Sequence, residues 1–254
     1  MTTLRRIVSA SCTVVLLAGL VAPLRAQTAR EIVDKVDRLL RGNSSRGTAT
    51  MEVVTAHFDR TMEMRVWSLG TSYALIRILA PAKDAGTATL KVNNEIWNYL
   101  PRVDRTIRLP ASLMSSSWMG SHFTNDDLVK EDRLVDDYDI VQSFDGVRDG
   151  EAVWEFTLTP KPDAAVVWGK IVERIRKRDL MPIWGKYYDA DGTLIRTMTF
   201  SDYRTMGGRL VPATMEVVPA DKPNEHTILH YESLEFNVGL TSSFFSLQRL
   251  RSGR

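Results

Sequence analysis

Apolar and polar residues alternate along most of this chain, which is the pattern of strands in a sheet with one buried face. In RTMEMRVW (60–67), Met62, Met64 and Val66 share one face, while the residues between them share the other. The alternation continues in TSYALIRIL (71–79), GTATLKV (86–92) and EIWNYL (95–100). A second series of strands is expected from about residue 138 to the C-terminus.

Short turn sequences separate these segments, so we expect neighbouring strands to run antiparallel. The sheet needs roughly ten strands, and a sheet of that size must curl or close rather than stay flat. The simplest architecture is one long, strongly curved meander with helices on its concave side. The expected turns are Asp59-Arg60, Gly70-Thr71, PAKDAG (81–86), Asn93-Asn94, Asp145-Gly146, Asp149-Gly150, Asp191-Gly192 and Gly207-Gly208.

Two regions show helical rather than strand spacing. TARE (28–31) has the form of a capping box, apolar residues follow at helical spacing, and Gly42 can end the helix. The stretch 111–137 is the one long segment without strand periodicity. It holds two candidate helices, SLMSSSWM (112–119) and TNDDLVKEDRLVDD (124–137), the second capped by Thr124 or Asn125.

The first 26 residues have the pattern of a secretory signal peptide. Arg5 and Arg6 precede an apolar run (7–22), and Ala26 is a small residue before the expected cleavage site. The chain of 254 residues has a net charge of +2, and residues 1–26 hold three arginines and no acid, so residues 27–254 carry a net charge of −1. The single cysteine, Cys12, lies in this leader. An exported chain without disulfides is typical of the periplasm, and its charge gives no reason to expect nucleic acid binding.

Apolar side chains exceed what one face of a sheet requires. The chain has six Trp and ten Met, and a curved sheet with such a lining could hold a lipid chain. The alternative is an ordinary core beneath two helices. The candidate lining is Trp67, Trp97, Tyr99, Trp154, Phe156 and Trp184. A shift of one residue in the assignment of faces would exchange this set for its neighbours.

The stretch SSSWMGSHFTNDDL (115–128) combines serine, histidine and aspartate with large apolar residues. It lacks the Gly-x-Ser-x-Gly elbow of the α/β-hydrolases, so we expect a flap rather than a catalytic loop. The lid candidates are Leu113, Met114, Trp118, Met119 and Phe123. We expect no catalytic residue.

Metal ligation is not expected either. His226 and His230 lie four apart, but on a strand they would be roughly 13 Å apart, too far to share an ion. DADG (189–192) resembles the start of a calcium loop but lacks its glutamate, and we interpret it as a hairpin turn. We expect no cofactor.

Several blocks of this sequence resemble the outer-membrane lipoprotein-sorting protein family, the LolA-like periplasmic carriers. They are NYLPRVDRTIRLP (98–110), SWMGSHFTNDDL (117–128), VVWGKI (166–171) and MPIWGKYYDADGTLIRTMTFSDY (181–203). The resemblance implies a mainly β (α+β) fold, an incomplete antiparallel β-barrel whose concave face is covered by helices. Residues 27–254 would form one such half-barrel domain, with 111–137 as a helical lid insertion.

The resemblance also implies a function. The protein would bind lipids or lipoprotein acyl chains in the periplasm and move them toward the outer membrane, possible partners being an inner-membrane transporter and an outer-membrane acceptor. The alternative is an adaptor that binds no lipid and docks on an inner-membrane lipid-exporting transporter. Its contact surface would be the loop 81–86 and ERIRKR (173–178), where Arg174, Arg176 and Arg178 share a strand face. A large apolar pocket under 111–128 would favour the carrier, and a filled interior the adaptor.

Overall fold

The structure is a computed structural model that describes residues 27–127 and 134–252. The predicted signal peptide (1–26) and the middle of the second predicted lid helix (128–133) lie outside the described residues. Within the described residues, no helix is long and apolar enough to cross a membrane.

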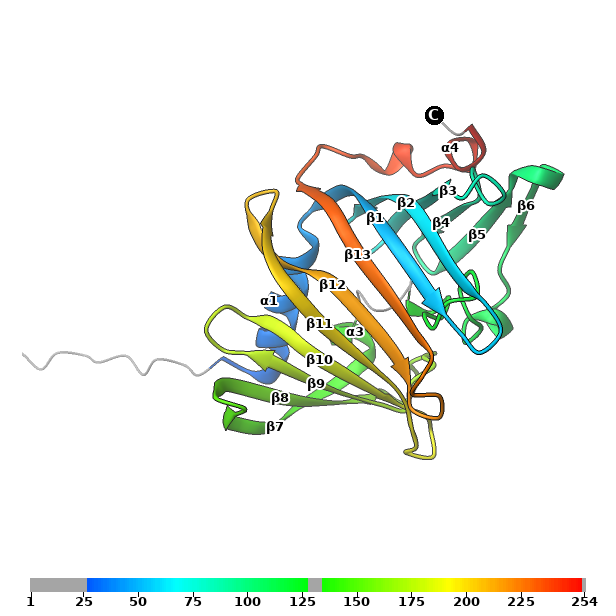
Figure 1. The fold of residues 1–254 in the computed structure, drawn as a ribbon. Coiled ribbons are helices and arrows are strands. Elements are labelled where there is room, and N and C mark those ends of the chain that lie inside the picture. The colour runs from blue at the N-terminus through cyan, green and yellow to red at the C-terminus, as the bar shows by residue number, and fades with distance from the viewer. Residues whose placement is uncertain (1–26, 128–133, 253–254) are drawn as a thin grey trace, which may run out of the picture.

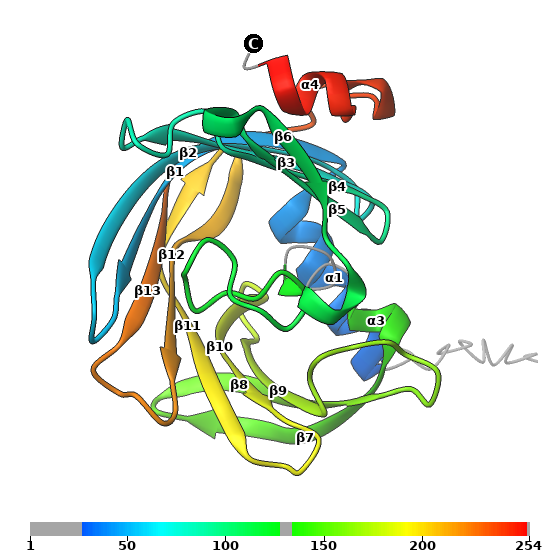
Figure 2. The same ribbon diagram turned by 90° about the vertical axis from the view of Figure 1, so that its right-hand side faces the viewer.

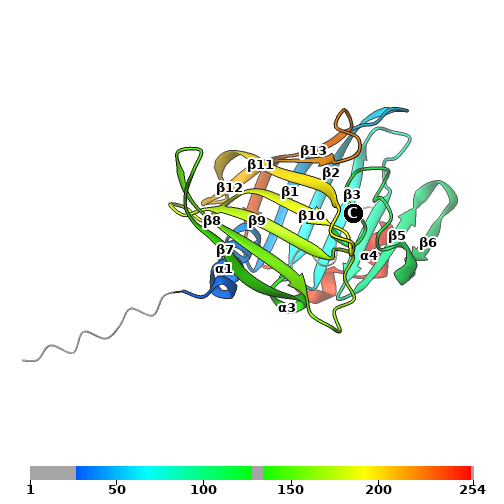
Figure 3. The ribbon, with the colours of Figure 1, turned by 90° about the horizontal axis from the view of Figure 1, so that it is seen from below.

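Thirteen antiparallel strands form one curved sheet (Figures 1 and 3). Strands β1–β6 form one meander and β7–β13 form another, and the pairing of β1 with β13 joins the two. The strands are β1 (Ser44–Val54), β2 (Asp59–Leu69), β3 (Tyr73–Ala80), β4 (Ala88–Val92), β5 (Glu95–Leu100), β6 (Arg105–Arg108), β7 (Tyr138–Arg148), β8 (Glu151–Pro160), β9 (Lys170–Arg176), β10 (Met181–Tyr188), β11 (Leu194–Met206), β12 (Arg209–Pro219) and β13 (His226–Phe236).

The prediction of a mainly β fold with an incomplete barrel is confirmed, but the expected single meander of ten strands is wrong. The first strand, β1, pairs with the last strand, β13, and this contact joins distant parts of the chain. Local turn signals do not encode such a contact. Gly47 makes this contact possible, because a Cβ at this position would lie 2.3 Å from the carbonyl oxygen of Ser233 on β13. The two free edges, β6 and β7, are therefore consecutive in sequence but lie at opposite ends of the sheet.

Helix α1 (Ala29–Arg41) lies inside the curve of the sheet (Figure 2). Its start and end are as predicted: Thr28 and Glu31 form the capping box, and Gly42 follows the last turn with φ of 68°. The helix buries Ile32, Val33 and Val36 in the main apolar cluster. Inward residues of the strands, such as Met62 and Met64 on β2, complete that cluster.

The C-terminal segment lies on the opposite, convex side, as Figure 2 shows for α4 (Leu247–Ser252). A short 3-10 helix, Ser242–Phe244, precedes it. Phe245 and Leu250 pack there on Leu75 and Leu90 in a second apolar cluster. Buried Arg77 donates hydrogen bonds to two carbonyls of α4, those of Arg249 at 2.7 Å and Leu250 at 3.2 Å. This outer cover was not predicted.

Two of the predicted turns are displaced. Asp59 and Arg60 open β2, and the turn lies at residues 55–58, where the Thr55 hydroxyl accepts hydrogen bonds from the amides of His57 and Phe58. Asp145-Gly146 lies inside β7, whose register shifts at a bulge between Gln142 and Phe144. In both cases residues with turn propensity are held in a strand by their pairing partners.

Candidate functional site

A cavity of about 320 Å³ lies between α1 and the concave face of the sheet. This volume is at the lower end of the roughly 300–1,000 Å³ of small-molecule sites. Most of its wall is apolar because α1 presents the helical face of Val33, Val36 and Leu40 to the inward positions of the strands. Those inward residues include Val66, Ile76, Ile175, Tyr187, Phe200, Met215 and Tyr231.

The first part of the connection between β6 and β7, residues 109–127, enters the open side of the curve (Figure 2). We refer to residues 111–127 as the lid. The first predicted lid helix is wrong. Residues Ala111–Leu113 form one 3-10 turn, and the chain then makes a small hairpin in which Ser117 and Thr124 form an isolated antiparallel bridge.

Local chemistry explains the hairpin. Met119 and Gly120 have φ of 54° and 79°, so both central residues of the tip are left-handed, as a type I′ turn requires. The Ser117 hydroxyl donates to the carbonyl of Ser121 at 2.6 Å, and the Ser121 hydroxyl donates to the carbonyl of Trp118 at 2.7 Å. Serine side chains that bind the backbone in this way compete with helix formation.

The apolar lid residues fall into two groups. Trp118 and Phe123 are buried in the main cluster, and Met119 packs against it. The Trp118 indole also donates a hydrogen bond of 3.1 Å to the Thr89 hydroxyl on β4. Met114 packs instead on Ile96 and Leu109, and Leu113 is 45% exposed. The candidate residues Trp118, Met119 and Phe123 therefore come together, whereas Leu113 does not join them.

A buried ion pair fixes the end of the lid. The Arg196 guanidinium on β11 donates two hydrogen bonds of 2.6 Å to the carboxylate of Asp127, and one of 2.9 Å to the carbonyl of His122. The guanidinium carbon also lies 4.5 Å from the ring centroid of Trp168 and 4.4 Å from that of Tyr187. Asp127 and Thr124 exchange hydrogen bonds in the manner of a helix cap, as predicted for Thr124.

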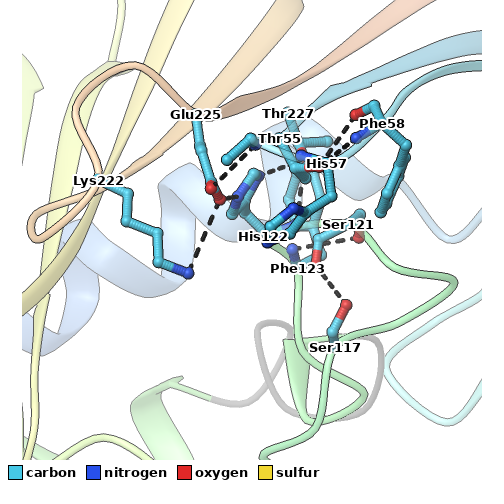
Figure 4. Close-up of polar contacts among 11 residues, drawn as sticks. Thr55, His57, Phe58, Ser117, Ser121, His122, Phe123, Lys222, Glu225 and Thr227 are labelled. Carbon is cyan, nitrogen blue, oxygen red and sulfur yellow. Dashed lines mark hydrogen bonds and ion pairs between the residues drawn. The ribbon is translucent and has the colours of Figure 1, made fainter.

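The lid tip is tied to the neighbouring hairpins by polar contacts (Figure 4). The His122 amide donates to the Thr227 hydroxyl at 3.0 Å, and the His122 ring lies 2.8 Å from the same hydroxyl through Nδ1 and 3.3 Å from the Glu225 carboxylate through Nε2. Glu225 also accepts from the Ala56 amide at 3.1 Å, a bond that helps to lower the pKa of its carboxyl. Arg60 donates to the carbonyl of Met119 at 3.1 Å.

The hydroxyl beside His122 belongs to Thr227, which is fully buried. A nucleophile must be open to its substrate, so this threonine, histidine and glutamate arrangement serves to hold the lid. Ser117 and Ser121 donate to lid carbonyls instead. Among the described residues, no group of three or more His, Cys, Asp and Glu side chains could hold a metal ion.

Charged side chains also line the cavity. Asp37 and Arg41, one helical turn apart on α1, form an ion pair there. Lys91 on β4 and Glu173 on β9 join them from the sheet. Burial, and secondly the charge of Asp37, raise the pKa of Glu173 to about 7. None of these four residues was a sequence candidate. The available signal was a charged residue at an inward strand position, as Lys91 is in GTATLKV.

Of the six lining candidates, Trp154 and Phe156 lie on the inward face of β8. Phe156 is fully buried in the main cluster and Trp154 packs against that cluster. The Trp154 indole donates to Asp145 at 3.1 Å. Neither residue is among those that line the 320 Å³ cavity, so contact with a ligand stays a prediction for both.

The other four candidates have their rings on the convex side. Trp67, Leu75, Leu90 and Trp97 stand opposite one another on β2–β5, with Tyr99 in the same outer cluster. The Trp67 ring lies 5.8 Å from that of Phe244, and the Trp184 ring has Arg174 at 4.8 Å and Lys186 at 4.9 Å. Trp67 and Trp184 are nevertheless among the residues that line the cavity. The face of β5 was therefore assigned the wrong way round, because Trp97 and Tyr99 lie in the outer cluster and do not line the cavity.

The basic segment 173–178 is not a free positive patch, and Arg178 lies in the turn after β9 rather than on the strand. Arg174 pairs with Glu155 at 2.8 Å and Asp149 at 2.9 Å. Arg176 pairs with Asp179 at 2.8 Å, and Arg178 lies 3.2 Å from Glu151. Each positive charge has an acidic neighbour, so this surface offers little attraction to an acidic partner.

Comparison with known proteins adds to this geometry. A family model described as "-like: Uncharacterized protein" matches residues 70–252. The chain is 25% identical to a putative outer membrane lipoprotein-sorting protein domain from Vibrio parahaemolyticus, with a TM-score of 0.78 over 88% of this chain and 98% of that one. No curated protein matches the chain significantly.

Two further structures share the fold. A DUF1329 family protein from Desulfovibrio piger has a TM-score of 0.80 and 23% identity, over 87% of this chain and 97% of that one. A LolA superfamily protein from Nitrosomonas europaea has a TM-score of 0.75 and 22% identity, over 87% and 98%.

Proposed function

The chain belongs to the LolA-like family of outer-membrane lipoprotein-sorting proteins, and from this premise we propose that it is a periplasmic carrier of lipid or lipoprotein acyl chains. The observation that carries the proposal is the apolar cavity of about 320 Å³ between α1 and the sheet, next to a lid whose own large side chains lie in the same apolar cluster. A carrier needs an apolar cavity and a movable segment that can enlarge this cavity when cargo binds.

The lid supports an exchange of contacts. Trp118, Met119 and Phe123 contribute apolar surface to the interior, and an acyl chain could take over that surface when the lid moves. Each buried methylene contributes about 0.8 kcal/mol, so ten methylenes contribute roughly 8 kcal/mol. Before the cost of moving the lid is subtracted, this corresponds to a dissociation constant of about 1 μM. Cargo with several acyl chains needs the space that the lid now fills.

The location and the partners are part of the proposal. The signal-peptide pattern of residues 1–26 directs export, and the related Vibrio structure is described as an outer membrane lipoprotein-sorting protein domain. The partners would be lipids or lipoprotein acyl chains, an inner-membrane transporter that supplies them and an outer-membrane acceptor. The adaptor alternative predicts a filled interior, whereas the interior holds a cavity.

Native mass spectrometry of the protein purified from a periplasmic fraction, with organic extraction of bound material, tests the proposal. We expect a population whose mass exceeds that of the polypeptide by a lipid or an acylated peptide. A matched sample, delipidated and then mixed with phospholipid vesicles, should regain that mass. A protein that stays free of lipid in both samples would refute the carrier and favour the adaptor.

A further inference from the structure

The cavity contains a carboxyl group that a purely apolar cargo does not require. Glu173 projects from β9 into the space beneath α1. Its register partners on the neighbouring strands, Phe156 on β8 and Gly185 on β10, supply no charge. Glu173 is half-buried by surface area because it lines the cavity, yet it lies deep enough that burial dominates its titration.

The other carboxylates that line the cavity differ from Glu173 because each has a cation beside it. Asp37 pairs with Arg41, and Asp127 pairs with Arg196, so each of these carboxylates has a cation beside it. Lys91 lies on β4, eight strands away from β9 along the sheet. The charged neighbour that acts on Glu173 is Asp37, whose negative charge opposes ionisation of the Glu173 carboxyl. The region between α1 and β9 therefore has an excess of carboxylate over cation.

We propose that the cavity selects amphiphiles whose buried end carries a protonated amine, with Glu173 as the acceptor beside Asp37. This inference rests on the proposed function, since it names the chemistry of the cargo that the carrier accepts. An ammonium ion gives a buried carboxylate the counter-charge that stabilises it, whereas a fatty-acid carboxylate adds a like charge.

The wall next to Glu173 suits a cation. Tyr187 follows two residues after Gly185, and a Cβ on Gly185 would lie 3.2 Å from the Tyr187 ring. The side of Glu173 that faces β10 is therefore bordered by an aromatic ring rather than by an aliphatic side chain. The Arg196 guanidinium carbon already lies 4.4 Å from the centroid of the Tyr187 ring, so this ring accepts a cation beside it, as aromatic rings commonly do.

The test compares head groups on one chain length. The neutral fluorescent probe prodan, which has no hydrogen-bond donor, is bound first and then displaced by dodecylamine, dodecanol or dodecanoate at pH 8, below their micellar concentrations. We expect dodecylamine to displace prodan at a concentration at least tenfold lower than dodecanoate, with dodecanol in between. Glu173→Gln should reduce that ratio to near one while prodan still binds.

Glu52→Gln is the matched control, because it makes the same substitution at an exposed strand position whose neighbour Met51 faces the core. This control should keep the wild-type ratio. Equal displacement by the amine and the carboxylate, or a preference that survives Glu173→Gln, would overturn the inference while prodan binding still supports a carrier. If the wild-type protein binds neither prodan nor any of the three amphiphiles, the carrier function and the inference both fail.

Discussion

Arg196 on β11 and Asp127 at the end of the lid form a two-bonded ion pair in which both contacts measure 2.6 Å and the side chains are only 3% and 4% exposed. A buried pair of this kind is costly to break, because the remaining charge has lost its partner. The pair joins two residues 69 positions apart and ties the lid to the sheet.

Breaking this pair should destabilise the protein measurably. We expect Asp127→Asn or Arg196→Met alone to lower the free energy of unfolding by about 3 kcal/mol, and the double variant to lose less than the sum of the two. Urea denaturation provides the measurement. The exposed pair Arg46–Glu235 is the control, and its removal should change the free energy of unfolding far less, because solvent screens the two charges. Additive losses at Arg196 and Asp127 would show that the two side chains act independently.

Two substitutions of Trp118 distinguish the contribution of apolar packing to stability from that of its hydrogen bond. Trp118→Ala removes a side chain that is 2% exposed and should cost about 3–5 kcal/mol of stability. Trp118→Phe keeps an aromatic ring but loses the hydrogen bond to Thr89, and should cost closer to 1 kcal/mol. Thermal denaturation gives both values. If the two variants were equally stable, Trp118 would not be packed as described.

Stability should depend on pH through Glu173. Its pKa is raised from 4.5 to about 7, so between these values the folded protein binds more protons than the unfolded chain. Stability from this group therefore falls as pH rises from about 4.5 to 7 and stays lower above that.

Glu173→Gln should thus be more stable than the wild type at pH 8, by on the order of 2–3 kcal/mol, and nearly equal to it at pH 4.5. Chemical denaturation at the two pH values measures the difference. Glu52→Gln, on the exposed face, should change stability by less than about 0.5 kcal/mol at either pH. A Glu173→Gln effect that is the same at both pH values would contradict a raised pKa.

Phe245 tests the assignment of the two faces. It packs on the convex side, with its ring 5.4 Å from that of Tyr73. Phe245→Ala should lower stability by about 3–5 kcal/mol without changing the affinity for prodan, because the cavity lies on the other side of the sheet. Ile76→Ala, at an inward position that lines the cavity, should change both. Loss of prodan binding in a folded Phe245→Ala protein would indicate that prodan binds on the convex side, which would contradict a site in the concave cavity.

The sequence was sufficient for local structure. The capping box of α1, the strand alternation and most turns depend on residues a few positions apart, and the structure has them as predicted. The pairing of β1 with β13 joins residues nearly two hundred positions apart, and no short pattern encodes it. The lid hairpin was missed because its serines bind the backbone and Met119 adopts a left-handed conformation that its residue type does not signal.

The choice of face failed for a different reason. Alternation tells which residues share a face, but not which face is inside. In β5, Ile96 and Asn98 point inward, while Trp97 and Tyr99 point to an outer face that the C-terminal segment covers. Because β5 has apolar residues on both of its faces, the face with the larger aromatic rings was predicted to line the cavity. Trp97 and Tyr99 do not line the cavity, whereas other aromatic residues such as Tyr187 and Phe200, and charged groups such as Lys91, do.

The most direct test of the carrier account is a reversible lock on the lid. Residues 27–254 contain no cysteine, so His122→Cys and Thr227→Cys introduce the only thiols of that part of the chain. The His122 amide lies 3.0 Å from the Thr227 hydroxyl, which brings the two backbones close enough for a disulfide. Uptake of the neutral probe prodan is then followed in the oxidised and the reduced forms of the same protein. We expect uptake to be at least tenfold slower in the oxidised form and restored on reduction. Equal uptake in both forms would contradict entry through a moving lid.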